Sequence, residues 1–356
     1  MSQGSRIDGR GLRVRRRSGR ATMRDVADRA GVGAITVSRF FTDPSTVSAS
    51  LATRIEQAVR ELGYVPNRIA GGLASAGARV IPVIVPSLAN AVYANIIQGI
   101  HDVLIPQGYQ ILLGPTGFSL AEEEALVTTS LGWSPQGIIL TGVDHTPHAR
   151  RLLLSARIPI VETMELGESP LDINVGFSHV QAGYAMTERL ITLGYRHIAF
   201  AGARLDQDVR AMRRCEGYLA ALRRHKLPTD LVLRFPTPTK YEQGAKALEW
   251  LLVQRPQIDA VFCHHDVLAV GVLLECQRKN VEVPRRLAVA GFNGLDISAA
   301  VIPRLTTVVS PRYRIGQLAA ELLLRRLKGE AVDRRVDVGF EIIERESTRP
   351  SRQRGR

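Results

Sequence analysis

Residues 22–41 read TMRDVADRAGVGAITVSRFF, and this order predicts two short helices separated by a tight turn. Thr22, followed three residues later by Asp25, forms a capping-box pattern that favours the start of a helix. Gly31 is expected to end that helix, because glycine readily adopts the left-handed conformation found after helix C-termini. A second short helix is predicted over 34–41. Two helices joined by a glycine-containing turn are typical of a helix-turn-helix.

A third helix is predicted to complete a small bundle. Ser48 is placed to cap it and Gly63 to end it, and the apolar residues between them recur at helical spacing: Leu51, Ile55, Ala58, Val59 and Leu62. Polar groups on the outer face of the second helix suit contacts to phosphates and base edges, and apolar groups at its tip can touch thymine methyl groups. These residues are Thr36, Ser38 and Arg39 on the face, and Ala34 and Ile35 at the tip. The spacing alone also fits a three-helix bundle without a role in nucleic-acid binding.

A weak helix is expected after the bundle, in the segment that joins it to the rest of the chain. Asn67 can cap a short helix that runs through Ala74, but the segment is too short and too rich in glycine to be stable alone in water. Leu73 is its isolated apolar residue, and a leucine in such a position can wedge into a minor-groove base step. We therefore interpret 22–66 as a DNA-binding domain and 67–79 as a hinge helix and linker.

Positive charge is concentrated at the two ends of the chain. The net charge is +13 over 356 residues, and residues 1–79 hold fourteen arginines against six acidic residues. Residues 347–356 hold four arginines and no acidic residue, so the middle of the chain is close to neutral. Basic ends on a neutral body favour a polyanionic partner for those ends. We interpret 1–21 as a disordered basic leader and 347–356 as a basic tail.

No sequence feature directs the protein to a membrane or out of the cell. No run approaches eighteen apolar residues, and no apolar run follows the arginine-rich N-terminus. The three cysteines are widely spaced and odd in number, which favours neither a disulfide framework nor a metal site. We expect a cytoplasmic, nucleoid-associated protein with buried cysteines, no cofactor and no bound metal.

Beyond residue 79, short apolar strands alternate with helices in two successive series. Strands are expected at 81–85, 111–113, 138–140, 158–161 and 173–175, and then at 198–201, 232–234, 261–263 and 287–290. Helices are expected near 92–107, 121–131, 147–156, 180–193, 212–225, 241–254 and 267–279. Such alternation predicts parallel sheets covered by helices, and two series predict two lobes with a ligand cleft between them. The predicted fold is an all-α helix-turn-helix head on an α/β two-lobed core over 80–346.

No catalytic signature is found in this core. It contains no G-x-S-x-G, H-E-x-x-H or Walker sequence. His264-His265-Asp266 could suggest a metal site, but adjacent histidines at a strand end point to opposite faces. An enzyme on this fold would lack a nucleophile or an acid–base pair, and a periplasmic sugar-binding protein would need a signal peptide and no helix-turn-helix. Both alternatives are therefore less favoured than a regulator.

The head resembles that of LacI-type transcriptional repressors in three motifs. They are DVADRAGV at 25–32, TVSR at 36–39 and LGYVPNR at 62–68. The resemblance extends from residue 22 to about residue 347 and implies a periplasmic-binding-protein-like core, in which the chain crosses between lobes near 176–178, 308–311 and 337–340. It also implies a homodimer that binds a pseudo-palindromic operator in double-stranded DNA, with hinge leucines inserted at the operator centre.

The resemblance assigns the DNA contacts to the head and the hinge. The expected residues are Thr22, Ala34, Ile35, Thr36, Ser38, Arg39, Tyr64, Asn67, Arg68, Leu73 and Ala74. Two departures from the family are visible. Gly33 stands where the family usually has serine, so the second helix loses its side-chain cap, and Gly71-Gly72 lower the helix propensity of the hinge by about 1 kcal/mol per glycine.

The resemblance also indicates the effector. Arg214 matches the effector-binding arginine of the family, and its guanidinium can hold a carboxylate or two hydroxyls. His265 replaces the usual asparagine and Asn293 the usual aspartate, which makes the cleft less acidic and favours an anionic ligand. The expected effector-binding residues are Ser87, Asn90, Tyr93, Asp144, His145, Arg204, Arg214, Lys240, His265 and Asn293.

Shorter motifs resemble the gluconate-utilisation branch of the family. They are HTP at 145–147, LDINVGF at 171–177, GARLD at 202–206 and ECQ at 275–277. We therefore predict a sugar acid, gluconate or a keto-gluconate, as the effector, with a neutral sugar as the alternative. The sequence leaves open whether the effector acts as inducer or corepressor. It also leaves open a dimer or a tetramer, although the tail carries no heptad pattern of the kind that forms a tetramerising coil.

Overall fold

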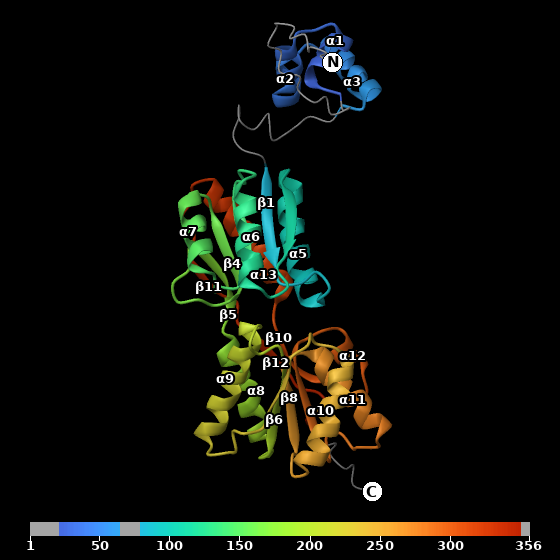
Figure 1. Cartoon of the computed structure of the whole chain (residues 1–356), viewed down its shortest axis with the longest axis vertical. Coiled ribbons are helices and arrows are strands. Elements are labelled where there is room, and N and C mark those ends of the chain that lie inside the picture. The colour runs from blue at the N-terminus through green and yellow to red at the C-terminus, as the bar shows by residue number, and fades with distance from the viewer. Residues whose placement is uncertain (1–20, 65–78, 350–356) are drawn as a thin grey trace, which may run out of the picture. The chain divides into compact units, whose positions relative to one another are not determined.

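The structure, a computed structural model, describes residues 21–64 and 79–349 (Figure 1). The chain divides into two compact units, Met1–Ala78 and Arg79–Arg356, and each is described by itself. We call the first unit the head and the second unit the core. No helix in the described ranges is long and apolar enough to cross a bilayer.

The head contains three α-helices around a small apolar centre. They are α1 (Met23–Ala30), α2 (Ala34–Thr42) and α3 (Ala49–Leu62), with the 3-10 turn η1 (Pro44–Thr46) before α3. The predicted capping box is present, because Thr22 Oγ1 accepts from the Asp25 amide at 3.3 Å and Asp25 Oδ2 accepts from the Thr22 amide at 2.7 Å. Val26, Val37 and Ile55 are fully buried, so one apolar position from each helix closes the bundle.

Glycines end the first and third helices as predicted. Gly31 has φ 64° and Gly63 has φ 58°, the left-handed conformation that glycine adopts at least cost. Two details of α3 differ from the sequence-based expectation. Ser48 occupies the N-cap position without a side-chain hydrogen bond to the helix, and Leu62 is 36% exposed because it falls at the frayed end of the apolar face.

The first sheet of the core has six strands in the order β11-β5-β4-β3-β1-β2, and all paired neighbours are parallel. The strands are β1 (Val80–Val85), β2 (Gln110–Pro115), β3 (Ile138–Thr141), β4 (Ile160–Glu165), β5 (Ile173–Phe177) and β11 (Arg335–Asp337). The helices that pack with them are α5 (Ala91–Leu104), α6 (Leu120–Leu131), α7 (Pro147–Ala156) and α13 (Arg312–Leu327), with the 3-10 turn η2 (Ile105–Gln107) after α5. We call these elements lobe 1.

The second sheet has six strands in the order β12-β10-β9-β8-β6-β7, parallel except for the β10–β12 pair. The strands are β6 (Ile198–Ala203), β7 (Val232–Phe235), β8 (Ala260–Cys263), β9 (Ala288–Asn293), β10 (Thr306–Val309) and β12 (Glu341–Ile343). The helices are α8 (His179–Thr192), α9 (Val209–Arg224), α10 (Tyr241–Gln254), α11 (Asp266–Arg278) and α12 (Ile297–Ala300). We call these elements lobe 2, and Figure 1 shows each sheet with its helices as a separate lobe of the core.

The chain crosses between the lobes three times, where the resemblance placed the crossings. The first crossing joins β5 to α8, the second joins β10 to α13, and the third joins β11 to β12. These connections lie at 178, 310–311 and 338–340. The parallel sheets follow from apolar runs such as Ile138-Ile139-Leu140, which are buried on both faces as crossover topology requires.

Several elements were not predicted or were predicted too short. The strands β10, β11 and β12 and the helices α12 and α13 were absent from the sequence-based assignment. Strand β4 was predicted at 158–161 but runs from Ile160 to Glu165. The prediction ended early because Glu162 and Glu165 interrupt the apolar run, although both side chains are buried in the structure. The predicted end of the core at 346 is also early, since Ser347 and Thr348 are fully buried and bonded to β9 and β10.

Helix α9 lies unusually close to helix α8. A Cβ at Gly217 would come within 2.0 Å of the Val180 carbonyl oxygen, and a Cβ at Gly183 within 2.2 Å of the Arg214 carbonyl oxygen. Only glycine fits at both points, so the two backbones are in direct contact. This packing fixes the position of α9, whose first turns carry Arg210 and Arg213 toward lobe 1.

Candidate functional site

The outer face of α2 carries the residues that were predicted to read DNA. Ala34, Ile35 and Arg39 are exposed, with Ile35 at 71%, and Thr36 and Ser38 are half-buried beside the inward-facing Val37. Packing of the bundle core does not explain the apolar side chain of Ile35, because Val37 is the residue of α2 that is buried in that core. The face is therefore available to base edges and phosphates.

The N-terminus of α2 has the predicted departure. Gly33 is its N-cap residue and makes no side-chain hydrogen bond to the helix, so backbone groups at this end are left without a side-chain cap. Thr22 is exposed at the start of α1, whereas Tyr64 is buried and packs against Phe41 with ring centroids 5.9 Å apart. The four remaining predicted contacts lie outside the described residues: Asn67, Arg68, Leu73 and Ala74.

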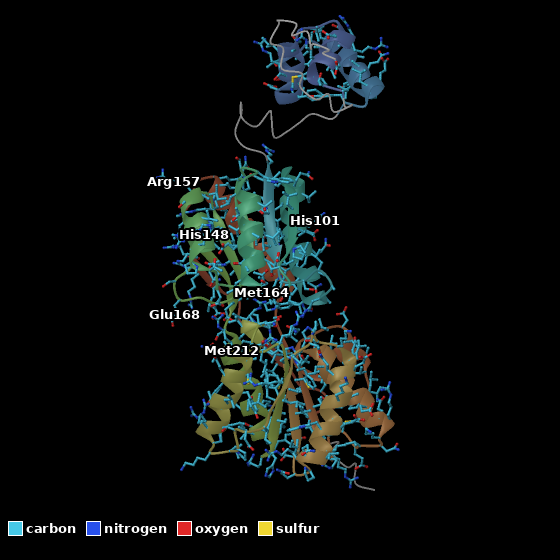
Figure 2. The ribbon with its side chains drawn as sticks, in the orientation of Figure 1. His101, His148, Arg157, Met164, Glu168 and Met212 are labelled. Carbon is cyan, nitrogen blue, oxygen red and sulfur yellow. The ribbon has the colours of Figure 1, made fainter. Side chains whose placement is uncertain are left out.

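A cavity of about 590 Å³ lies between the two lobes of the core. Figure 2 shows Met164 of lobe 1 and Met212 of lobe 2 near the junction of the lobes. Lobe 1 lines the cavity with Ser87, Ala89, Asn90, Ala91, Asn95 and Phe118. The remaining lining residues are Ala203, Arg204, Asp208, Pro238, Thr239, Tyr241, His265, Val267, Leu295, Asp296 and Ile297 of lobe 2, and Arg312 at the start of α13. A cavity of this size with a few polar groups is typical of a small-molecule site.

Four predicted effector residues line this cavity: Ser87, Asn90, Arg204 and His265. His265 Nδ1 accepts from the Val267 amide at 3.2 Å, which places the ring proton on Nε2. Burial, with His264 and Arg214 adding to it, holds the pKa of His265 well below its usual range, so the ring is neutral. Among the described residues, neither His265 Nε2 nor Arg204 Nε has a hydrogen-bond partner. Two cavity-lining residues thus each carry a buried donor nitrogen without a partner in the described part of the chain.

Acidic and basic groups that were not predicted also line the cavity. Asp208 caps α9 by accepting from the Ala211 amide at 3.1 Å, and its pKa is lowered because Arg210 and Arg214 outweigh the effect of burial. Arg312, the first residue of α13, donates from Nε to Asn95 Oδ1 of α5 at 3.3 Å. Neither Asp208 nor Arg312 was among the predicted effector residues.

Arg214 does not line this cavity. Its Nε donates to His179 Nδ1 at 3.0 Å, its Nη1 donates to the His264 carbonyl oxygen at 2.6 Å, and its guanidinium lies 4.1 Å from the centroid of the Phe292 ring. Burial lowers the pKa of Arg214 to about 10, so it remains charged at neutral pH. Its charge lies behind the cavity wall, close to Asp208.

Three other predicted residues also lie off the cavity wall. Tyr93 is buried and its hydroxyl accepts from Arg210 Nη2 at 3.0 Å. Asn293 is 1% exposed, its carbonyl oxygen accepts from Arg312, and its Oδ1 has no hydrogen-bond partner in the described part of the chain. Lys240 is exposed between two residues that do line the cavity.

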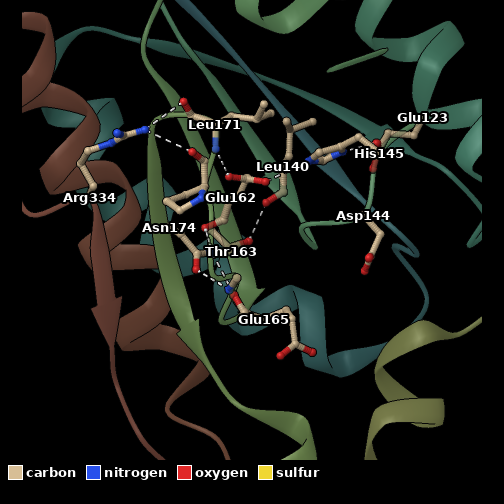
Figure 3. A network of polar contacts seen from close by, with 12 residues as sticks. Glu123, Leu140, Asp144, His145, Glu162, Thr163, Glu165, Leu171, Asn174 and Arg334 are labelled. Atoms are coloured by element: carbon tan, nitrogen blue, oxygen red, sulfur yellow. Dashed lines mark hydrogen bonds and ion pairs between the residues drawn. The ribbon is translucent and has the colours of Figure 1, made fainter. Parts of the chain in front are cut away.

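Asp144 and His145 belong to a polar network in lobe 1 (Figure 3). His145 Nδ1 is 2.5 Å from Glu123 Oε1 and its Nε2 is 3.2 Å from Glu162 Oε1, with the side chain only 1% exposed. Burial disfavours the charged ring, but the hydrogen bonds to the two carboxylates outweigh it and raise the pKa of His145 to about 9. Asp144 instead pairs with Arg213 of α9 at 3.0 Å.

A helix-turn-helix head and a two-lobed core with a cavity between its lobes define a ligand-responsive DNA-binding regulator. Residues 22–67 match the family model for bacterial regulatory proteins of the LacI family, and residues 187–348 match a periplasmic binding protein-like domain. The chain belongs to the LacI family and is a DNA-binding transcriptional regulator.

The similarity extends over nearly the whole chain. The HTH-type transcriptional regulator GntR of Pseudomonas aeruginosa is 43% identical over 94% of this chain and 97% of its own length. GntR of Escherichia coli strain K12 is 41% identical over 90% of this chain and 96% of its own length. A crystal structure of a LacI-family regulator from Silicibacter pomeroyi has a TM-score of 0.88 at 32% identity and covers 93% of this chain and 100% of its own.

Proposed function

We propose that the cavity between the lobes is the effector site and that it binds a sugar acid such as gluconate or a keto-gluconate. The observation that carries the proposal is the pair of unsatisfied buried donors, Arg204 Nε and His265 Nε2. A carboxylate accepts charge-assisted hydrogen bonds from an arginine, and the carboxylates of Asp208 and Asp296 can accept from sugar hydroxyls. The motifs of the gluconate-utilisation branch support the same ligand.

We further propose that the ligand controls the head. The regulator acts as a homodimer in the cytoplasm, on the nucleoid, and catalyses no reaction. Its α2 helices read a pseudo-palindromic operator through Ala34 and Ile35, while Leu73 from each hinge enters the operator centre. Effector binding changes the relation between the lobes and thereby the spacing of the hinges, which couples the cavity to DNA affinity. Arg214 supports the cavity wall from behind through Asp208 and His264.

A neutral sugar is the second candidate. The lining carries Asp208 and Asp296 against Arg204 and Arg312, so its formal charges balance. Such a wall would also suit a ligand that offers only hydroxyl groups. The two candidates differ in what they ask of Arg204, because only the sugar acid brings a carboxylate to it.

Calorimetry with gluconate and with glucose separates the candidates. We expect gluconate to bind and glucose to bind at least about tenfold more weakly, and Arg204→Gln to weaken gluconate by about ten- to a hundredfold, the range for a lost charge-assisted hydrogen bond. Arg223→Gln, an exposed arginine on α9, is the matched control and should leave binding unchanged. Tight binding of glucose, or gluconate affinity that is indifferent to Arg204→Gln, would contradict the proposal.

A further inference from the structure

Two arginines of α9 reach from lobe 2 into lobe 1. Arg210 Nη2 donates to the Tyr93 hydroxyl at 3.0 Å. Arg213 Nη2 lies 3.0 Å from Asp144 Oδ1, and its Nη1 lies 3.2 Å from Glu165 Oε2. Tyr93 is on α5, Asp144 follows β3 and Glu165 ends β4, so α9 is tied to three separate elements of the other lobe.

The Arg210–Tyr93 contact and the Glu165 side chain are withdrawn from water, whereas the Arg213 and Asp144 side chains are 23% and 39% exposed. Arg210 is 8% exposed and Tyr93 3% exposed, and the Glu165 side chain is 5% exposed. A Cβ at Gly142 of lobe 1, which has φ 108°, would lie 3.2 Å from Arg210 Nη1, so the guanidinium rests against the backbone there. Separating the lobes would break these contacts and return the groups to water, so the contacts favour the joined arrangement by what they gain beyond the cost of desolvation.

The lobe 1 side of these contacts is held in place by its own network. His145, the residue after Asp144, is fixed between Glu123 and Glu162, and Glu162 Oε2 also accepts from the Leu171 amide at 2.7 Å. Figure 3 shows the carboxylates of Asp144 and Glu165 extending away from this network. The segment that carries Asp144 is thus anchored and presents its carboxylate to α9.

The lobe 2 side is equally fixed. The glycine contacts between α8 and α9 leave no room for α9 to move, and Arg214 is bonded to His179 and to the His264 carbonyl oxygen. The contacts therefore join two rigid surfaces. Neither Arg210 nor Arg213 lines the cavity, and the same is true of Tyr93, Asp144 and Glu165.

We propose that Arg210 and Arg213 form an interlobe latch that holds the lobes in the arrangement in which both line the cavity. The inference rests on the proposed function, because it assigns the latch to the effector cavity. Opening the lobes would separate Ser87 and Asn90 from Arg204 and His265, so a ligand that needs both walls binds only the latched form. Effector affinity then falls in proportion to the latched fraction, although no latch residue touches the effector.

A double-mutant cycle on Arg213 and Asp144 tests the latch. Arg213→Gln, which removes the contacts to both Asp144 and Glu165, should weaken gluconate binding by about tenfold, and Asp144→Asn should weaken it by less. The double variant should lose no more than Arg213→Gln alone, because Asp144 acts through Arg213. Arg223→Gln on the same helix should leave the affinity unchanged. Unchanged affinity in the single variants, or losses that multiply in the double variant, would overturn the latch.

A measurement without ligand tests the latch independently of the identity of the effector. Spin labels at His148→Cys on α7 and Glu216→Cys on α9, both exposed positions, report the distance between the lobes. Arg213→Gln should broaden this distance distribution toward longer values. The control variant Arg223→Gln should leave the distribution as it is in the parent protein. An unchanged distribution in Arg213→Gln would overturn the latch even if gluconate binds. If gluconate fails to bind but the distribution broadens, the proposed effector is wrong and the latch stands.

Discussion

His145 gives the most quantitative test of the network in lobe 1. The ring is buried between Glu123 and Glu162, and its pKa is raised from the ordinary 6.5 to about 9. Because the folded protein holds this proton more tightly than the unfolded chain, the proton contributes stability fully below about pH 6.5. That contribution is lost as the pH rises through about 9. The difference corresponds to about 3 kcal/mol of unfolding free energy at 1.36 kcal/mol per pH unit.

The assay is urea unfolding of the parent and of His145→Gln between pH 6 and pH 10. The chain has two tryptophans, Trp133 in lobe 1 and Trp250 in lobe 2, so a Trp250→Phe background makes fluorescence report on lobe 1. We expect the parent to exceed the variant by about 3 kcal/mol more at pH 6 than at pH 10. His148→Gln, an exposed histidine on α7, is the control and should show no such change.

Two results would refute the reasoning about His145. One is a stability difference between parent and variant that stays constant from pH 6 to pH 10. The other is an NMR titration in which the His145 ring changes protonation near pH 6.5, which would mean that the two carboxylates do not hold its proton.

Two further predictions concern the head and the core. Arg39→Ala should weaken operator binding and reduce the slope of log affinity against log salt by about one phosphate contact, which filter binding at several salt concentrations measures; an unchanged slope would argue against a backbone contact. Gly217→Ala should destabilise the core by about 1–3 kcal/mol or more, because its Cβ would meet the Val180 carbonyl oxygen, and a melting temperature equal to that of the parent would show that α8 and α9 can separate.

The head was predictable because its signals are local. The capping box at Thr22 and the glycines after α1 and α3 act within a few residues of the helix ends that they fix. The apolar spacing of α3 carries the same kind of information, although Leu62 lies outside the core. Local hydrogen bonding and backbone conformation decide such features, so no tertiary knowledge is needed.

The core sheets were predictable only where strands are long and apolar. Strands β11 and β12 have only three residues each, Arg335–Asp337 and Glu341–Ile343, so neither contains an apolar run long enough to mark a strand. Strand β4 contains Glu162 and Glu165, whose burial depends on His145 and Arg213, residues far away in sequence. Partners of this kind can be found only once the fold is known.

The effector wall was predicted in part for the same reason. Ser87, Asn90, Arg204 and His265 follow the carboxyl ends of strands, where ligands of parallel sheets bind, and they line the cavity. The placement of Arg214 behind the wall depends on the close packing of α8 against α9, which the sequence shows only as isolated glycines. His145 turns away from the cavity because two buried carboxylates hold it.

The central claim is that a sugar acid in the interlobe cavity changes how tightly the head binds DNA. The direct measurement is the affinity of the full chain for an operator selected from random duplex DNA and located by footprinting, with and without saturating gluconate. The account predicts that gluconate shifts this affinity by at least about tenfold, within the usual range of allosteric coupling, and that Arg204→Gln reduces the response at the same gluconate concentration. An operator affinity that stays the same while calorimetry shows the cavity to be filled would contradict it.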